Sequence, residues 1–351
     1  MVEAGMKTIS KQDPGLFDYQ NRMAELSRKA HALEKLDGRI NWEMYRAILE
    51  RATDKEAKGP GGRPRYDGVM MFKVLVLQRY YNLSDEQTEF QIKDRLTFQK
   101  FLGLWLSDTV PDEKTIWLFR EELTKAGVVE KLFRRFEKHL GEAGLTGQEG
   151  KIIDASFVDV PRQRNSREEN TQIKSGEVPE SFQENENRLR QKDVEARWTK
   201  KGEEVHYGYK NHVKADKTTK LIEDYEVTDA SVHDSQPVGD LVEEGDGTLH
   251  ADSAYTGETI ETILEENNVK GEICEKGYRN HPMTARQKKR NRKKSKIRVR
   301  VEHIFGFMTN TMKDGLKMRW IGMKRITAGI GLLNLVYNMA RYEQIIRLDL
   351  A

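Results

Sequence analysis

Three acidic residues, far apart in the sequence, stand in local patterns where a carboxylate can do chemistry. Asp252 ends a short apolar strand predicted over residues 248–251 and precedes a turn and a helix. An acid at the carboxyl end of a strand in an alternating β/α segment lies where such folds bind ligands. Asp154 lies within a strand predicted over residues 151–158, where an unpaired carboxylate costs free energy. An edge position or a salt bridge to a lysine is the alternative for Asp154, and the nearby Asp159 competes with it.

Glu302 is the third candidate, and it follows the most basic part of the chain. Between residues 286 and 300, ten of the fifteen residues are Lys or Arg. Glu302 comes four residues after Arg298 on a predicted helix, so both side chains project from one face. A surface ion pair is the ordinary explanation, but Arg before Glu is the less stabilising order on a helix. Glu302 is therefore a candidate functional carboxylate.

Charge is distributed unevenly along the 351 residues, although the formal net charge is only +3. Residues 223–272 hold fifteen acids and one lysine, whereas residues 275–325 hold seventeen basic residues and three acids. These adjacent acidic and basic segments favour a polyanionic partner and an acid-rich or metal-binding centre.

The single cysteine, Cys274, excludes an intrachain disulfide and argues against a cysteine-based zinc site. Without a signal stretch or an apolar run long enough to span a bilayer, the sequence predicts a cytoplasmic protein.

Helical periodicity dominates residues 1–147, and the sequence from Ser84 to Gln87 forms a capping box at the start of one predicted helix. Short helices joined by short turns are compatible with a helix-turn-helix DNA reader, but the pattern is common among helical domains, and on periodicity alone an ordinary helical bundle is favoured. Residues 161–204 hold 20 charged residues in 44 and are predicted to form a solvated insertion. Trp198 within it either docks this arm on the body of the protein or contacts a nucleic acid base.

Strand patterns begin at residue 151 and continue with a predicted hairpin over residues 206–228 and the strand that ends at Asp252. This order of elements, with the basic helix and Glu302 behind it, resembles the Asp-Asp-Glu transposases of bacterial insertion sequences, in the branch typified by insertion sequence five. The segments that carry the resemblance are Gly62-Arg63-Pro64-Arg65-Tyr66-Asp67, Leu83-Ser84-Asp85-Glu86-Gln87, Val110-Pro111-Asp112-Glu113-Lys114-Thr115, Trp198 to Gly202 with His206 to His212, Ala251 to Gly257, and Arg298 to Glu302.

The resemblance implies an α+β or α/β fold with two domains. A helical, end-recognition domain would span residues 1–147, and a ribonuclease-H-like domain with a five-stranded mixed sheet flanked by helices would span residues 148–351. Asp154, Asp252 and Glu302 would converge there as catalytic residues and as ligands of two Mg²⁺ ions, with Mn²⁺ as an alternative. Two such ions about 3.5–4 Å apart can activate the attacking oxygen and stabilise the leaving one.

The implied function is binding of the element's terminal inverted repeats, followed by cleavage and transfer to target DNA. A homodimer or larger assembly acting at the bacterial nucleoid, without membrane association, would bring two ends together. The rival interpretation is a catalytically inactive, transposase-derived DNA-binding repressor; a general nuclease leaves the helical domain unexplained.

The expected DNA contacts are mostly basic residues of the late helix and of one amino-terminal loop. They are Arg63, Arg65, Lys210, Lys288, Lys289, Arg290, Arg292, Lys293, Lys294, Arg298 and Lys313, with Trp198 and Tyr255 as further contacts. A strand-face salt bridge is the alternative role for Lys210. The chain also departs from the family pattern, since Ser295 and Thr309 replace a commoner Tyr and Lys, and Lys313 is the substitute expected for that lysine.

Overall fold

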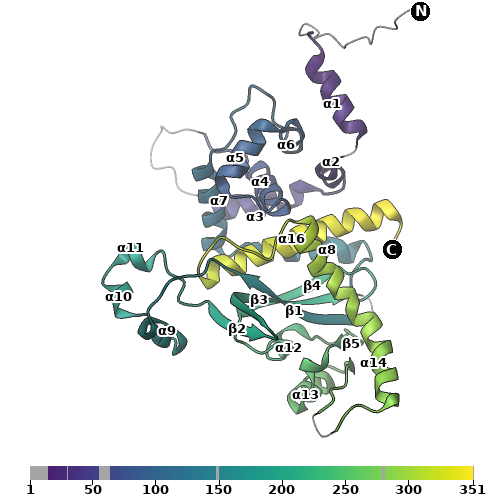
Figure 1. The fold of residues 1–351 in the computed structure, drawn as a ribbon. Helices are drawn as coiled ribbons and strands as arrows, with labels where there is room; N and C mark the ends of the chain where they lie inside the picture. The colour runs from purple at the N-terminus through teal and green to yellow at the C-terminus, as the bar shows by residue number, and fades with distance from the viewer. Residues whose placement is uncertain (1–14, 30, 55–63, 148–149, 279–280, 351) are drawn as a thin grey trace, which may run out of the picture.

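The computed structural model describes residues 15–29, 31–54, 64–147, 150–278 and 281–350 (Figure 1). A helical region comes first, as the sequence predicts. Its helices are α1 (Asp18–Arg28), α2 (Ala32–Asp37), the 3₁₀ helix η1 (Trp42–Tyr45), α3 (Arg46–Thr53), α4 (Gly68–Tyr80), α5 (Asp85–Asp94), α6 (Leu96–Leu102), α7 (Glu113–Ala126) and α8 (Val129–Glu142).

Side-chain caps fix where α4, α5 and α7 begin. The predicted cap Ser84 accepts a hydrogen bond from the backbone amide of Gln87 (3.2 Å), and Asp112 accepts one from Thr115 (2.7 Å). Asp67 does the same for α4 through the amide of Met70 (2.9 Å). Each bond satisfies an amide that has no partner within the helix, so polar residues of the sequence determine the element boundaries.

The sheet of the described residues has six strands, whereas the resemblance implies five. They are β1 (Lys151–Asp159), β2 (Arg197–Lys201), β3 (Glu204–Asp216), β4 (Ile222–Asp229), β5 (Thr248–Ala251) and β6 (Lys270–Ile273). The order is β2-β3-β1-β5-β6, and β4 continues the edge of β3 beyond β2. Strands β1, β5 and β6 are parallel, and the pairs made by β3 are antiparallel. The extra strand is β2, which comes from the charged segment.

The remaining helices surround this sheet (Figure 1). They are α9 (Arg167–Lys174), α10 (Glu180–Gln183) and α11 (Glu186–Leu189) of the insertion, α12 (Val238–Leu241), η2 (Ser253–Tyr255), α13 (Glu258–Glu266), α14 (Ala285–Arg298), η3 (Val299–Val301), α15 (Glu302–Gly306), the π-helical turn η4 (Phe307–Thr311) and α16 (Met323–Leu348). The insertion forms a separate lobe beside β2, and α14 extends along the opposite side of the molecule (Figure 1).

The long helix α16 lies between the amino-terminal helices and the sheet (Figure 1). Its side chains join one continuous core with residues of α4, α8, β3 and β4. The two asparagines that interrupt its apolar sequence hold it on the sheet. Asn334 exchanges amide hydrogen bonds with Asn211 of β3 (2.8 and 3.1 Å), and Asn338 bonds both backbone groups of Ile222 (2.8 and 2.6 Å). No described helix has the length and apolarity needed to cross a membrane.

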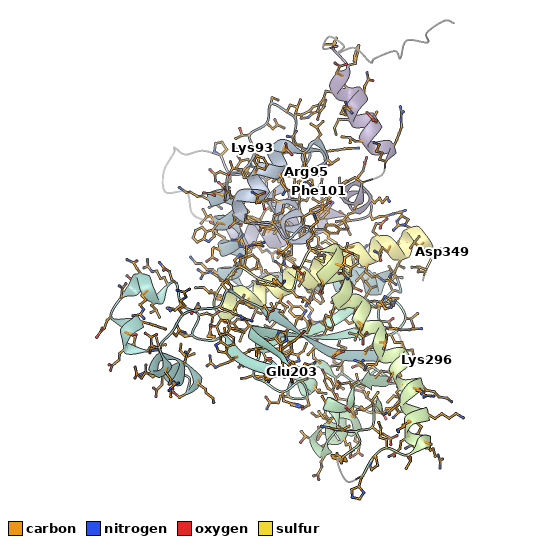
Figure 2. The ribbon with its side chains drawn as sticks, viewed as in Figure 1. Lys93, Arg95, Phe101, Glu203, Lys296 and Asp349 are labelled. Atoms are coloured by element: carbon orange, nitrogen blue, oxygen red, sulfur yellow. The ribbon has the colours of Figure 1, made fainter. Side chains whose placement is uncertain are left out.

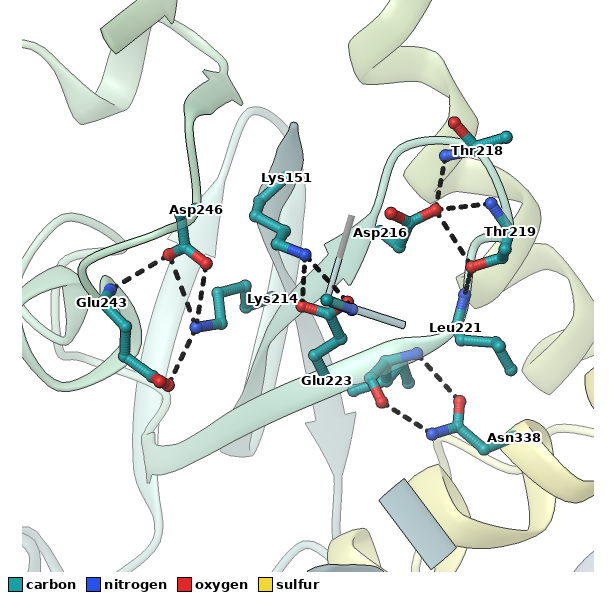
Figure 3. Close-up of polar contacts among 12 residues, drawn as sticks. Lys151, Lys214, Asp216, Thr218, Thr219, Leu221, Glu223, Glu243, Asp246 and Asn338 are labelled. Carbon is teal, nitrogen blue, oxygen red and sulfur yellow. Dashed lines mark hydrogen bonds and ion pairs between the residues drawn. The ribbon is translucent and has the colours of Figure 1, made fainter. Parts of the chain in front are cut away.

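Two buried lysines are compensated by acids within the sheet region (Figure 3). Lys151, with a side chain 2% exposed, lies 2.6 Å from a carboxylate oxygen of Glu223. Lys214, 3% exposed, lies between Glu243 (3.0 Å) and Asp246 (3.4 Å). A charge removed from water in this way is tolerated because its partner is adjacent.

Replacing Lys151 by Met is expected to lower the free energy of unfolding by about 3 kcal/mol, because Glu223 is left as a buried, uncompensated charge. Urea denaturation followed by circular dichroism measures the change. Adding Glu223→Gln to the same chain should recover most of the loss.

The control is Lys270→Met, which removes an exposed ion pair with Glu272 and should cost less than about 1 kcal/mol. Equal losses in the Lys151 and Lys270 variants would show that the buried pair has no special importance.

Candidate functional site: a carboxylate centre at the end of the parallel strands

Asp154 and Asp252 lie on the same face of neighbouring parallel strands. The β1–β5 register pairs Lys151 with Leu249 and Ile152 with His250. Continued by two residues, this register places Asp154 beside Asp252, which directly follows β5. The sequence predicted Asp252 at the end of a strand, and the structure places Asp154 of the neighbouring strand β1 beside it.

Local hydrogen bonds orient both side chains. Oδ1 of Asp252 accepts the amide of Ala254 (2.7 Å) and so begins the short helix η2. Oδ1 of Asp154 accepts the amide of the following residue, Ala155 (2.8 Å). In each case one carboxylate oxygen is bound to the backbone.

One guanidinium group connects Asp154 with Glu302. Arg298 is the last residue of α14, and its Nη1 lies 3.2 Å from Oδ2 of Asp154 while its Nη2 lies 3.0 Å from Oε1 of Glu302. Side-chain exposure rises from 16% at Asp154 to 23% at Arg298 and 57% at Glu302. The centre therefore runs from the sheet surface outward to solvent, with Arg298 in the middle.

The path of the chain after β6 fixes the position of Arg298 and Glu302. Helix α14 begins at a capping box in which Thr284 accepts the amide of Gln287 and the Gln287 side chain accepts the amide of Thr284. Directly after it, Val301 and Ile304 are buried in the main core. These two apolar anchors flank Glu302 and turn it toward β1.

Burial, with a smaller contribution from the negative charge of Asp252, raises the pKa of the Asp154 carboxyl from 3.8 to about 6, against the opposing effects of the Ala155 amide and Arg298. A desolvated carboxylate beside a second acid is the environment in which bound cations are most favourable, because a cation offsets both burial and repulsion.

The donor chemistry of this centre fits a hard divalent cation. Carboxylate oxygens are the ligands that Mg²⁺ prefers, and Arg298 already places a positive charge between two of them. Within the described ranges no three His, Cys, Asp or Glu side chains are drawn together closely enough to hold one ion. Binding of a metal by all three acids therefore requires Arg298 to leave and Glu302 to approach Asp154.

Comparison with known families agrees with this geometry. Residues 145–339 match the family described as the transposase DDE domain, and residues 21–122 match a family described as a transposase domain. No solved structure matches the chain. Since the first match covers more than half of the sequence, the chain belongs to the DDE transposases, enzymes that cleave DNA and transfer its strands with divalent metal ions. Its helical region followed by a mixed sheet flanked by helices is the ribonuclease-H-like arrangement of that family.

The basic segment predicted to bind DNA forms the single helix α14, whose side chains extend from the body of the protein (Figure 2, where Lys296 is labelled). Of the predicted contacts on it, Lys288, Lys289, Arg290, Arg292 and Lys293 are exposed, as are the neighbouring Arg286 and Lys296. Three predicted contacts have protein partners: Arg290 binds Glu275 (2.7 and 2.9 Å), Lys294 donates to the carbonyl of Ile273 (2.8 Å), and Arg298 binds Asp154 and Glu302.

The other predicted DNA contacts are scattered. Arg63 lies outside the described residues, and Arg65 donates to the carbonyl of Thr53. Lys313 is exposed on the segment before α16, with its ammonium 5.9 Å from the ring centroid of Tyr81.

Trp198, a further predicted contact, is 47% exposed on β2. It packs against Tyr207 (ring centroids 4.7 Å apart), and the guanidinium of Arg162 lies on its ring. Trp198 thus packs within the hairpin of β2 and β3, and about half of its side chain stays exposed.

Two predicted DNA contacts do not fit the structure. Tyr255 has a fully buried side chain, and burial together with the charges of Asp154, Asp234 and Asp252 raises its pKa far above the ordinary value. It packs behind the acids instead of facing DNA.

Lys210 points to the sheet face opposite to Asp154, where it binds Asp234 (2.7 Å). Its position therefore agrees with the alternative role given above, a salt bridge on the face of the strand.

Asp159, the competing acid of β1, lies on the same sheet face as Lys210. It binds His206 (3.3 Å), whose ring stacks on Phe157 with centroids 4.0 Å apart. Sequence reasoning missed the pairs Asp159–His206 and Lys210–Asp234. The alternation of side chains along β3 places His206 and Lys210 on one face, but their partners follow only from the pairing of β1 with β3 and from the turn that carries Asp234.

The stability difference between Asp154→Asn and the natural chain is expected to depend on pH. Because the folded state holds the Asp154 proton up to about pH 6, ionisation of this group destabilises the fold progressively between about pH 4 and 6. Asparagine avoids that cost, so the variant should be more stable at pH 8, by at most about 3 kcal/mol, and not at pH 4. Thermal unfolding at both pH values, without divalent ions, measures the difference. An identical difference at both pH values would contradict the assigned environment.

Proposed function

We propose that Asp154, Asp252 and Glu302 form the catalytic centre of a transposase that cleaves the terminal inverted repeats of its own insertion sequence and joins them to target DNA. The observation that supports this best is that Arg298 binds both Asp154 and Glu302, while Asp252 lies beside Asp154. We further propose that the acids hold two Mg²⁺ ions, with Mn²⁺ as a substitute. When bound, these ions would activate the attacking oxygen and stabilise the leaving one.

The protein's own groups prepare the site in a definite order. Asp154 must lose its proton before it can help to hold a cation, and Asp252 beside it would hold the same cation. Arg298 neutralises the centre while no ion is bound. Displaced from Asp154, its guanidinium remains on the same helical face as Glu302, where it can bind a DNA phosphate through paired N–H groups.

DNA would be held on both sides of this centre. We assign residues 1–147 to recognition of the terminal repeats and residues 148–351 to catalysis, in a protein of the branch typified by insertion sequence five. Helix α14 would follow the phosphate backbone with its exposed lysines and arginines. Since two ends must be joined, we infer a homodimer or larger assembly acting on the bacterial nucleoid.

Asp252→Asn is expected to bind end DNA as the natural chain does but to lose cleavage by at least about a hundredfold, because a metal ligand is removed from a centre that acts by charge stabilisation. The assay uses duplexes with the inverted repeats that flank the gene, in the presence of Mg²⁺ or Mn²⁺. Glu302→Gln should have the same effect.

The matched control is Asp159→Asn, an acid on the opposite sheet face, which should cleave normally. Full activity of Glu302→Gln would remove that residue from the centre. Binding without cleavage by the natural chain itself would support the rival role, that of a transposase-derived repressor.

Replacing Lys289 and Lys293 of α14 by Gln should weaken DNA binding and reduce the slope of log K against log salt by about 2, since each released phosphate contact contributes about 0.9. The two lysines are four residues apart and exposed on one helix face. Fluorescence anisotropy between 50 and 200 mM salt measures the slope.

The exposed residues Lys174 of α9 and Arg347 of α16 provide the control pair, and their replacement by Gln should leave the slope unchanged. Equal slopes for both double variants would show that α14 does not contact the backbone.

A further inference from the structure

A second positively charged site lies away from the carboxylates, in a cleft of about 590 Å³. Three parts of the chain form it: helices α4, α5 and α7, the end of the charged insertion, and the segment that leads into α16. We call it the arginine cleft, after the five arginines in its lining: Arg79, Arg120, Arg190, Arg319 and Arg325. Only two acids, Asp85 and Glu121, line it as well.

Those two acids are already engaged. Asp85 binds Arg120 through both carboxylate oxygens (2.5 and 2.8 Å), and Glu121 binds Arg325 in the same manner (2.7 and 2.9 Å). Arg190 pairs with Glu186 on its own helical turn, where both side chains are largely exposed. Arg79 and Arg319 are left without a carboxylate partner among the residues that the structure describes.

Arg79 and Arg319 instead converge on a neutral group. Both guanidinium groups approach Oδ1 of Asn82, at 3.5 and 3.2 Å respectively, and Arg79 also donates to the carbonyl of Gly315. Arg79 is only 5% exposed. Burial, together with the nearby charges of Arg319 and Arg120, lowers its pKa to about 9, so it still carries its charge at neutral pH. The cleft lining therefore carries positive charge that no carboxylate in the described part of the chain balances. Because the surrounding protein has a low dielectric constant, the electric field of this charge in the cleft is stronger than it would be in water.

Aromatic rings complete the lining. Trp320 lies against two of the guanidinium groups, 4.7 Å from Arg120 and 5.6 Å from Arg79. It packs on α16 at Gly329, where a side chain would overlap its ring. Trp117 of α7 remains 46% exposed, a large flat surface at the cleft that no core requires. Arginines with an exposed indole are the combination that binds phosphates beside sugars and bases.

We propose that the arginine cleft binds backbone phosphates of the DNA on which the enzyme acts, several base pairs from the site of cleavage. This inference rests on the proposed function. Pro161, which lines the cleft, follows Asp154 by seven residues along β1 and its extension, or about 23 Å at about 3.3 Å per residue. At about 3.4 Å per base pair, that separation corresponds to about six or seven base pairs of duplex.

The proposal also gives the charged insertion a role. Arg190 follows α11 and reaches the cleft from the insertion, while Asp193 and Glu195 hold the insertion to the segment before α16 through the amides of Gly322 (2.9 Å) and Met323 (2.6 Å). The cleft is therefore complete only when the insertion is docked.

The test is Arg319→Gln in the full chain, with Arg319→Lys and Arg347→Gln as matched variants. Arg319 is exposed, so its replacement spares the core. Arg347 lies 22 residues beyond Arg325 on α16, about 33 Å away at about 1.5 Å per residue. Binding of a terminal-repeat duplex is measured by anisotropy from 50 to 200 mM salt, and folding by thermal unfolding.

Arg319→Gln should weaken binding about five- to tenfold at 150 mM salt and reduce the salt slope by about 0.9, whereas Arg319→Lys and Arg347→Gln should keep the natural slope. A single uncharged methylphosphonate about six base pairs from the cleavage site should weaken binding by the natural chain and have little further effect on Arg319→Gln.

Each contrary outcome has its own meaning. If the natural chain binds and cleaves its ends while Arg319→Gln keeps the same affinity and slope, the cleft proposal is overturned and the proposed function stands. If Arg319→Gln instead loses self-association without any change in slope, the cleft holds an acidic surface of a second copy, and the proposal is again wrong. If the natural chain neither binds nor cleaves terminal repeats, the proposed function fails, and the cleft proposal fails with it.

Discussion

The charge of Arg298 is the interaction on which the carboxylate centre depends. Asp154 and Arg298 are separated by 144 residues in the chain, yet their side chains form an ion pair, and the same guanidinium binds Glu302. Acids brought this close would otherwise repel, and two unit charges about 5 Å apart do so by about 3 kcal/mol at an effective dielectric constant near 20. The fold can therefore assemble the centre before any metal ion arrives.

The framework behind this centre is a hydrophobic core shared by the two halves of the molecule. Helix α16 contacts α4, α7 and α8 on one side and β4 on the other. Its two asparagines form side-chain hydrogen bonds to the strands β3 and β4, which apolar side chains could not form. Because buried amides are costly unless paired, these bonds also fix the rotation of the helix over the sheet. The position of η3 and α15, and hence of Glu302, follows from that packing.

Local features were predictable from the sequence, and long-range pairings were not. The caps at Ser84 and Asp112 and the acid at the end of β5 each depend on a few neighbouring residues. The direction of Lys210 depends on strand pairing, and its partner Asp234 lies 24 residues away. The burial of Tyr255 depends on how η2 packs behind β1 and β5. Composition alone assigns the polar sequence of β2 to solvent, and only the resemblance, in which Trp198 to Gly202 and His206 to His212 form a hairpin, indicates this strand.

The place of α16 in the chain has a consequence for synthesis. This helix lies later in the sequence than every other described element, yet it fills the centre of the molecule. During translation the amino-terminal helices and the sheet therefore emerge from the ribosome without the element that joins them. Polypeptides cut short by a premature stop codon would lack the central layer, so an interrupted copy of the gene would release no competent nuclease into the cell.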